Sequence, residues 1–376
     1  MSLIHRILLS VISVLLAAGA VSCAGSRFDE PEVRTTSTLV LRVNLAGGTM
    51  SRAQEADKEA ANDGEKMNTL RVIILDGDNF VEHNSLWTLE SPDVQKNGIR
   101  FKVKANDTKT IIFVANEDGT VIDVPSSDGL SGFTETTAGA YFGALNPAVG
   151  QKVDIAVLRG ITMSLNKNLD KGTGVGAGMV LRRPLAINDI YSYAIGEAPE
   201  YNATFYIGRA AVKYTFRITN NDYKNDHTVT SLTIGRVAPV QYFFQNAVFT
   251  DDNHFFWSSY TTPAAAGSAS ALTIPCNTVL PKGQTTEVGP FYVPEGAEYG
   301  TAYSVGFSFD GQSMGDQAIE WKIPEEAGTD DPGTPMLDLP RNTHVITNVT
   351  LNYQSWTLDY TVCPWQVYDI TIPDFD

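Results

Sequence analysis

Apolar and polar residues alternate through much of this chain, and period-two alternation predicts β-strands. In residues 38–45 one face of the predicted strand carries Leu39, Leu41, Val43 and Leu45. Further strands are predicted at residues 70–75, 99–104, 110–115, 153–158, 204–207, 211–218, 229–234, 286–293, 302–309, 318–323, 344–352, 355–362 and 367–372. These runs are rich in Val, Ile, Thr, Phe and Tyr. Many short strands separated by turn residues predict an all-β fold built from sandwiches.

Three segments depart from the strand pattern. Residues 52–66 are rich in Ala, Glu, Lys and Asp without an apolar stripe, so we expect them to be exposed and mobile. Residues 170–178 contain four glycines and predict a flexible loop. Residues 325–335 combine acidic residues with Pro and Gly and predict a second exposed loop.

The length of the chain indicates two domains. It has 376 residues, 43% of them hydrophobic, which is enough for two independent cores. A fresh set of strands begins near Phe205, so we place the boundary between residues 203 and 204. The second domain would then run from 204 to 376.

The amino terminus resembles a bacterial lipoprotein signal. Arg6 precedes an apolar run from Ile7 to Ala18, too short for a membrane span of roughly 20 residues, and small residues then lead to Cys23. Cleavage before Cys23 would leave residues 1–22 as the signal peptide and expose the thiol and the new amino group for acylation. The alternative is an ordinary signal peptide cut after Ala20. Both interpretations predict an exported protein.

Charge and cysteine content limit the partners and the cross-links. The formal net charge of −16 argues against nucleic acid and against an anionic membrane surface as partners. Of the three cysteines, Cys276 and Cys363 remain if Cys23 is lipidated. They could form one disulfide in an oxidising compartment or remain as two separate thiols.

The sequence contains no recognisable catalytic constellation. Gly311–Gly315 matches the pattern G-x-S-x-G, but a strand is predicted after it instead of the helix of a nucleophile elbow, so it predicts a hairpin. The five histidines lie far apart, and no His/Cys pair has metal-ligand spacing. Tyr191, Tyr193 and Tyr201 could stack on a sugar, although aromatic residues at strand spacing usually pack in cores. We therefore expect no enzyme, no cofactor and no metal.

Four segments together resemble a known family. Residues 66–76, 109–116, 209–214 and 341–344 are similar, in order and spacing, to strands of the fimbrillins, the type V pilus subunits of the Bacteroidales. The resemblance covers essentially the whole mature chain. It implies two transthyretin-like β-sandwich domains in a lipoprotein precursor.

The resemblance also implies a route of assembly. A trypsin-like surface protease would remove an amino-terminal strand, and a strand from a neighbouring subunit would fill the groove. Ser51-Arg52-Ala53 follows the strand of residues 38–45 in a polar stretch of the kind that proteases cut, so cleavage between Arg52 and Ala53 is predicted. Residues 23–52 would be the propeptide, and residues 53–203 the first domain. The membrane would be contacted only through the precursor lipid.

The carboxy terminus is the candidate donor strand. Tyr368, Ile370 and Ile372 share one face and repeat the spacing of the removable strand. The alternative is a final strand that completes its own sandwich. The resulting hypothesis is a fimbrial stalk subunit whose partners are other copies of itself or related pilins. An uncleaved anchor or tip subunit and a surface glycan-binding lipoprotein are the alternatives, and no pattern identifies a receptor.

Overall fold

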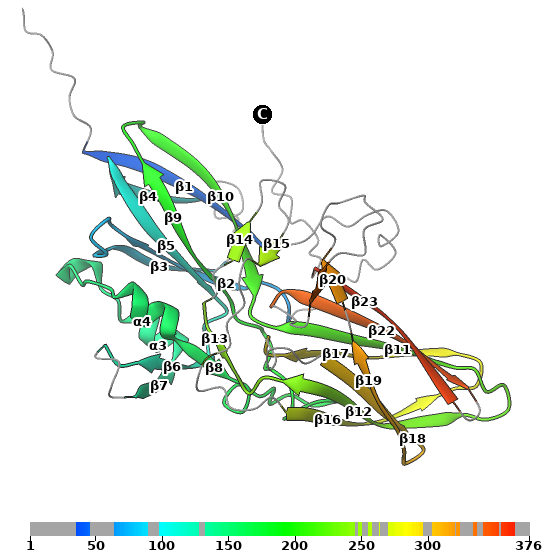
Figure 1. The fold of residues 1–376 in the computed structure, drawn as a ribbon. Coiled ribbons are helices and arrows are strands. Elements are labelled where there is room, and N and C mark those ends of the chain that lie inside the picture. Colours follow the sequence, from blue (N-terminus) through cyan, green and yellow to red (C-terminus); the bar gives the residue numbers. More distant parts are fainter. Residues whose placement is uncertain are drawn as a thin grey trace, which may run out of the picture.

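The computed structural model describes residues 35–45, 64–88, 98–127, 132–244, 247–249, 255–257, 263, 270–295, 303–319, 321–323, 334–336, 341–352 and 355–364. Within these ranges the chain is almost entirely β, with a few short helical turns (Figure 1). The strands form two sandwich domains in tandem, which confirms the predicted all-β class.

The first domain is built around a sheet of seven strands. They are β1 (Thr36–Leu45), β2 (Thr69–Leu75), β3 (Val81–Thr88), β4 (Ile99–Lys104), β5 (Asp107–Ala115), β9 (Ile187–Ile195) and β10 (Glu200–Arg209). Their order in the sheet is β3-β2-β5-β9-β10-β1-β4. The sheet encloses one core, whose larger members are Leu39, Leu41, Leu70, Val72, Ile74, Phe101, Ile111, Phe113, Phe205 and Ile207.

A smaller layer covers the outer face of β2 and β5. It consists of β6 (Val121–Pro125), β7 (Phe133–Thr137), β8 (Thr162–Ser164), β13 (Val240–Tyr242), α3 (Ala138–Gly143), the 3-10 turn η2 (Pro147–Val149) and α4 (Ile155–Gly160). Ile73 and Leu75 of β2 point into this second core, whereas Val72 and Ile74 point into the first. Burial of both faces explains why β2 is apolar almost throughout instead of alternating.

The strand predicted at residues 153–158 is wrong, because this segment forms α4. The Asp154 carboxylate accepts hydrogen bonds from the backbone N–H groups of Ala156 (2.8 Å) and Val157 (3.4 Å). These bonds satisfy donors that the first helical turn leaves free. A short apolar run is compatible with either element, and here the cap favours the helix.

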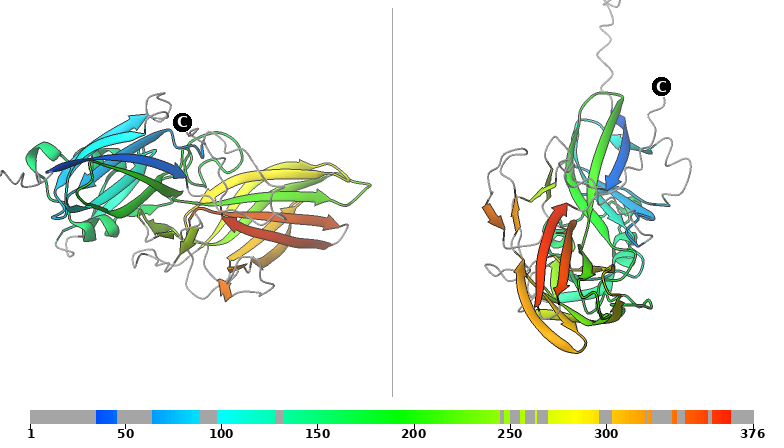
Figure 2. Two further views of the ribbon diagram at one scale, coloured as in Figure 1. Left: turned by 90° about the horizontal axis from the view of Figure 1, so that it is seen from above. Right: turned by 90° about the vertical axis from the view of Figure 1, so that its right-hand side faces the viewer.

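The second domain is a sandwich of two four-stranded sheets. One sheet has the order β17-β11-β22-β23 and the other β16-β12-β18-β19. The strands are β11 (Val212–Asn220), β12 (His227–Val237), β16 (Ser270–Leu280), β17 (Thr285–Val293), β18 (Tyr303–Phe309), β19 (Gln312–Ile319), β22 (Thr343–Asn352) and β23 (Ser355–Pro364). Figure 2 shows this domain beyond the end of the first. Its core includes Tyr214, Phe216, Leu232, Ile274, Phe291 and Phe307.

Two short ribbons complete the described strands. One pairs β14 (Ala247–Phe249) with β15 (Phe255–Trp257), and the other pairs β20 (Trp321–Ile323) with β21 (Thr334–Met336). The strand predicted at residues 318–323 is therefore divided between β19 and β20. The hairpin predicted at Gly311–Gly315 is confirmed, since Phe309 pairs with Gln312 and β19 follows.

The glycine-rich loop at residues 170–178 packs more closely than the sequence predicts. Asp170 is buried, and its backbone N–H and C=O pair with Val180 and Gly178. A Cβ atom at Gly176 would lie 3.0 Å from the Phe291 ring, so the loop depends on glycine for its contact with the second domain.

Candidate functional site

Strand β1 occupies an interior position in the seven-stranded sheet. It pairs parallel with β10 from Thr38 opposite Glu200 to Leu45 opposite Ile207. On its other side it pairs antiparallel with β4, from Thr36 opposite Lys104 to Leu41 opposite Ile99. Removal of β1 would therefore leave two rows of unpaired backbone groups facing each other across a gap one strand wide.

The side chains of β1 fill that gap on both faces. Leu39 and Leu41 are fully buried in the first core, and Val43 packs at its margin. Val40, on the opposite face, is also buried, at 2% exposure. The backbone of Leu45 pairs with Ile207, while its side chain lies outside the described residues. The predicted inward face is thus present in Leu39, Leu41 and Val43.

An ion pair crosses the outer face of β1. The guanidinium of Arg100 on β4 lies 2.5 Å from the carboxylate of Glu200 on β10. Because β4 and β10 are not neighbours, this pair spans the strand between them. At the start of the strand, the Ser37 hydroxyl donates to the carbonyl of Ala198 at 2.7 Å.

The chain is fixed again at Glu65, 20 residues after β1 ends. The Glu65 carboxylate accepts a hydrogen bond from the Tyr292 hydroxyl at 2.6 Å and lies 3.0 Å from the Lys213 ammonium. Its backbone carbonyl accepts from Arg209 Nε at 3.0 Å. Glu65 is only 1% exposed, so the expectation of an exposed stretch through residue 66 is wrong at this residue.

Burial shifts the pKa of a basic residue in the cluster around Glu65. Desolvation lowers the pKa of Arg209 to about 10, although Glu65 opposes the shift. The arginine remains charged at neutral pH, and the negative charge of Glu65 partly offsets its desolvation. Arg209 ends β10 in the main sheet of the first domain, and Lys213 and Tyr292 belong to the second domain, so Glu65 contacts both.

A second buried ion pair lies at the same junction. Arg341 donates from its backbone N–H and Nε to the Glu295 carboxylate at 2.8 and 2.7 Å. Its Nη1 also donates to Asn188 Oδ1 on β9 (3.1 Å) and to the carbonyl of Phe243 (2.7 Å). Arg341 therefore links the second domain to the main sheet of the first.

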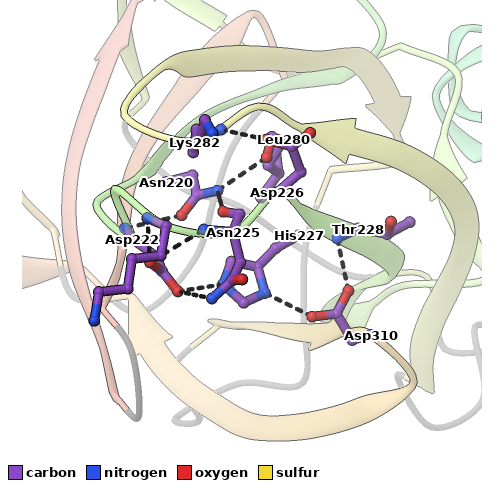
Figure 3. A network of polar contacts seen from close by, with 10 residues as sticks. Asn220, Asp222, Asn225, Asp226, His227, Thr228, Leu280, Lys282 and Asp310 are labelled. Carbon is purple, nitrogen blue, oxygen red and sulfur yellow. Dashed lines mark hydrogen bonds and ion pairs between the residues drawn. The ribbon is translucent and has the colours of Figure 1, made fainter.

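A separate polar network lies at the far end of the second domain (Figure 3). His227 Nδ1 is 2.6 Å from Asp310 Oδ2 in the β18–β19 turn, and His227 Nε2 is 3.3 Å from Asp222 Oδ2 in the β11–β12 turn. Because a carboxylate only accepts, both ring nitrogens must donate, which defines an imidazolium. The hydrogen bond that His227 donates to Asp310, and after it the one donated to Asp222, raise the pKa of His227, although partial burial opposes the shift.

Further hydrogen bonds connect this network to residues of neighbouring turns. The Asn225 amide and the backbone N–H of Lys224 lower the pKa of Asp222 to about 2. Asp310 Oδ1 accepts from the backbone N–H of Thr228 at 2.8 Å. The Asn220 amide donates to the carbonyl of Leu280 at 2.9 Å, which ties in the end of β16.

Several predicted site residues lie outside the described residues. They are the lipidation candidate Cys23, the cleavage site Arg52 and Ala53, and the donor candidates Tyr368, Ile370 and Ile372. Their roles stay predictions. Cys276 is a free, buried thiol, and burial raises its pKa to about 11, so the unpaired alternative holds for this cysteine.

Within the described ranges, no three His, Cys, Asp or Glu side chains gather in a way that could hold a metal ion. Among the same residues, no helix has the length and apolar character needed to cross a bilayer. His344 is not a free ligand, because its Nε2 lies 3.0 Å from Thr215 Oγ1 and burial lowers its pKa to about 3.

The fold defines a two-domain β-sandwich protein with an interior amino-terminal strand. Residues 37–164 match the family model described as "Major fimbrial subunit protein (FimA)". The match begins within β1 and confirms the predicted fimbrillin resemblance over this part of the chain. No curated protein matches the chain significantly.

The solved structures that resemble this chain have low sequence identity to it. The tip fimbrial protein Mfa3 of Porphyromonas gingivalis, with a C-terminal truncation, is 12% identical over 88% of this chain and 100% of its own, with a TM-score of 0.49. A putative cell adhesion protein from Bacteroides eggerthii is 12% identical over 89% and 98%, with a TM-score of 0.46. A fimbrial assembly protein from Parabacteroides distasonis is 11% identical over 88% and 98%, with a TM-score of 0.41.

Proposed function

We propose that this protein is a structural subunit of a surface fimbria that supports adhesion. It is exported as a lipoprotein precursor held at the outer membrane through Cys23. Proteolysis after Arg52 then matures it, and strand exchange joins it into an extracellular polymer. Its partners are other copies of itself or related pilins, together with a trypsin-like surface protease.

The interior position of β1 is the observation that supports this proposal best. Each of Leu39, Val40 and Leu41 contributes about 1.5–3 kcal/mol by burial, and the backbone of β1 pairs on both sides. A sheet that loses such a strand exposes an apolar trough between two unpaired backbone rows. A strand from another molecule can satisfy both features at once, through main-chain hydrogen bonds and alternate side-chain pockets.

The chain order supports the proposed cut after Arg52. Arg52 lies between the end of β1 at Leu45 and the buried Glu65. One cleavage there separates the lipid at Cys23 and the whole of β1 from the rest of the protein. The new amino-terminal segment would remain attached at the domain junction through Glu65, which is bound there by Tyr292 and Lys213.

The carboxy terminus is the proposed donor. Tyr368, Ile370 and Ile372 repeat the two-residue spacing of Leu39, Leu41 and Val43. β23 ends at Pro364, so the segment 367–376 follows the last described strand and is available in sequence to pair elsewhere. The proposal involves no catalytic residue, cofactor or metal, and no nucleic acid.

The amino-terminal sequence of protein purified from the cell surface tests this proposal. A subunit taken from assembled fibres is expected to begin at Ala53, and Arg52→Ala is expected to keep the precursor at the membrane. Deletion of residues 367–376 should leave a folded monomer that does not polymerise after trypsin treatment. Fibres formed normally by that truncated protein would refute the donor assignment.

An uncleaved anchor or tip subunit is the alternative within the same family. It would keep the acylated Cys23 in assembled fibres, where mass spectrometry of the amino-terminal peptide would find it. A surface glycan-binding lipoprotein would bind sugars as a monomer and form no fibres. Calorimetry of the monomer with candidate glycans separates this outcome from both fimbrial roles.

A further inference from the structure

The two edge strands of the seven-stranded sheet, β3 and β4, approach each other without forming a backbone ladder. They stand at opposite ends of the strand order, yet side chains of β3 reach the backbone of β4. His83 Nε2 lies 2.7 Å from the carbonyl oxygen of Lys102. Glu82 Oε1 accepts from the backbone N–H of Lys104 at 2.5 Å. The sheet is thus closed by side chains along this line, which we call the β3–β4 seam.

The seam uses the edge of β4 that faces away from β1. The carbonyl of Lys102 and the N–H of Lys104 are two residues apart, so both point to the same side of the strand. The intervening backbone of Val103, together with that of Phe101, points to the other side, toward β1. The seam contacts are therefore independent of the ladder between β1 and β4.

Packing and charge fix the β3 side of the seam. The Phe101 ring packs against His83, with ring centroids 5.1 Å apart, and against Trp87 at 6.5 Å. Glu82 Oε2 is 2.7 Å from the ammonium of Lys109, which is fully buried and also pairs with Asp107. The Lys109 contact comes from β5 and holds Glu82 independently of β1, whereas the contacts of Phe101 are a further link between β4 and β3.

Strand β4 depends on β1 for its only ladder among the described strands. β1 pairs with both β10 and β4, whereas β4 pairs with β1 alone. When β1 leaves, β4 would have no backbone partner and could move onto β10, which also has a free edge. Such a movement would close the groove against an incoming strand.

We propose that His83 and Glu82 keep β4 in place after β1 has left, so that the groove stays one strand wide and open to a donor strand. This inference rests on the proposed function and adds two positioning residues to it. The Arg100–Glu200 ion pair assists on the outer face, because it links the two walls directly. His83 is the more specific of the two residues, since its hydrogen bond is made to β4 alone among the contacts described.

The binding of a synthetic peptide tests the inference. The full-length protein is cut with trypsin, the released amino-terminal fragment is washed out in mild denaturant, and a peptide of residues 36–45 is titrated back. His83→Ala should weaken peptide binding about tenfold, the size expected for the loss of one or two net hydrogen bonds. His83→Gln, which keeps a donor for the Lys102 carbonyl, should restore most of the affinity.

Leu86→Ala is the matched control, because Leu86 lies on the same strand, is 49% exposed and belongs to no hydrophobic core. It should bind the peptide like wild type. Equal affinity of His83→Ala and wild type would overturn the seam proposal. Failure of the cut wild-type protein to bind the peptide would instead overturn strand exchange itself.

Hydrogen exchange gives a second measurement that does not depend on a variant. In the cut, peptide-free wild-type protein, the amide of Lys104 should remain protected, because Glu82 accepts its hydrogen bond. The amides of Phe101 and Val103, which face the empty groove, should exchange quickly. Equally rapid exchange at all three positions would overturn the proposal.

Discussion

Glu65 and Lys213 form an ion pair 3.0 Å long in which the two side chains are only 1% and 4% exposed. The pair joins the segment just after the removable strand to the first strand of the second domain. Loss of one partner would leave a buried charge without compensation. We expect Glu65→Ala to lower the free energy of unfolding by about 3–5 kcal/mol, as measured by urea denaturation.

A matched control is Glu287→Ala, whose ion pair with Arg217 is exposed. Its effect should be below about 1 kcal/mol. Similar values for the two variants would show that the contacts of Glu65 do not stabilise the junction. If Glu65→Ala does not fold, Glu65→Gln should show a smaller loss of unfolding free energy. Its amide oxygen can still accept the hydrogen bond from the Tyr292 hydroxyl.

A substitution at Leu41 should destabilise the precursor but not the mature subunit. Leu41→Ala removes a fully buried side chain from the first core and should destabilise the precursor by about 2–5 kcal/mol. The assembled fibre should be as stable as wild type, because β1 is then no longer present. Thermal melting of the precursor and of the fibres compares the two states, with the exposed Arg42→Ala as the control. Fibres weakened as much as the precursor would contradict the removal of β1.

The burial of Val40 restricts the residue that a donor strand can place at the same position, between Ile370 and Ile372. In the register where Ile370 and Ile372 replace Leu39 and Leu41, Thr371 takes the position of the buried Val40. A carboxylate there would be desolvated, so Thr371→Asp should abolish polymerisation, whereas Thr371→Val should preserve it. Electron microscopy of trypsin-treated protein measures both, and normal fibres of Thr371→Asp would exclude this register.

The His227 network predicts a pH dependence of stability. The pKa of His227 is raised in the folded protein, so its contribution is complete below the unfolded value of about 6.5 and is lost as pH rises through the folded value. The pKa of Asp222 is lowered to about 2, so its contribution is present above about 4 and is lost as pH falls toward that value. The network is therefore most stabilising between about pH 4 and 6.5.

Replacement of the histidine isolates this effect. His227→Gln should lose about 0.5–1 kcal/mol relative to wild type at pH 5.5, a modest value because solvent screens the partly exposed pair. The difference should shrink toward pH 9. Comparison of the two proteins cancels other titrating groups, such as the buried Asp189, whose pKa burial raises to about 7. A difference that does not change with pH would show that the imidazolium is not the stabilising form.

Local patterns predicted many of the strands correctly. The alternation of Ile99, Phe101 and Val103 with three basic residues matches the alternating burial of β4. Strands without such a pattern were missed, among them β3, where Glu82, His83 and Asn84 interrupt any apolar alternation. Helix α4 was predicted as a strand, because the decisive feature was one capping carboxylate at Asp154 and not a periodic signal.

The charged residues of the fimbrillin-like segments illustrate what a sequence conceals. Lys109, Arg209, Lys213 and Arg341 look like ordinary surface residues, yet each is at least 97% buried. For two of them the partner lies far away along the chain: Lys213 pairs with Glu65, and Arg341 pairs with Glu295. Only the assembled domains show that Arg209, Lys213 and Arg341 bind the junction together, and that Lys109 pairs with Glu82 and Asp107 inside the first domain.

The sequence by itself determined that residues 38–45 form a strand with one apolar face, and that a polar segment with a basic residue follows it. It also indicated an exported all-β protein. Only the tertiary structure decided that this strand lies between β10 and β4, and that Val40 on its other face is buried as well. The physical reason is that side-chain alternation specifies the faces of a strand, whereas its neighbours depend on backbone pairing with residues far along the chain.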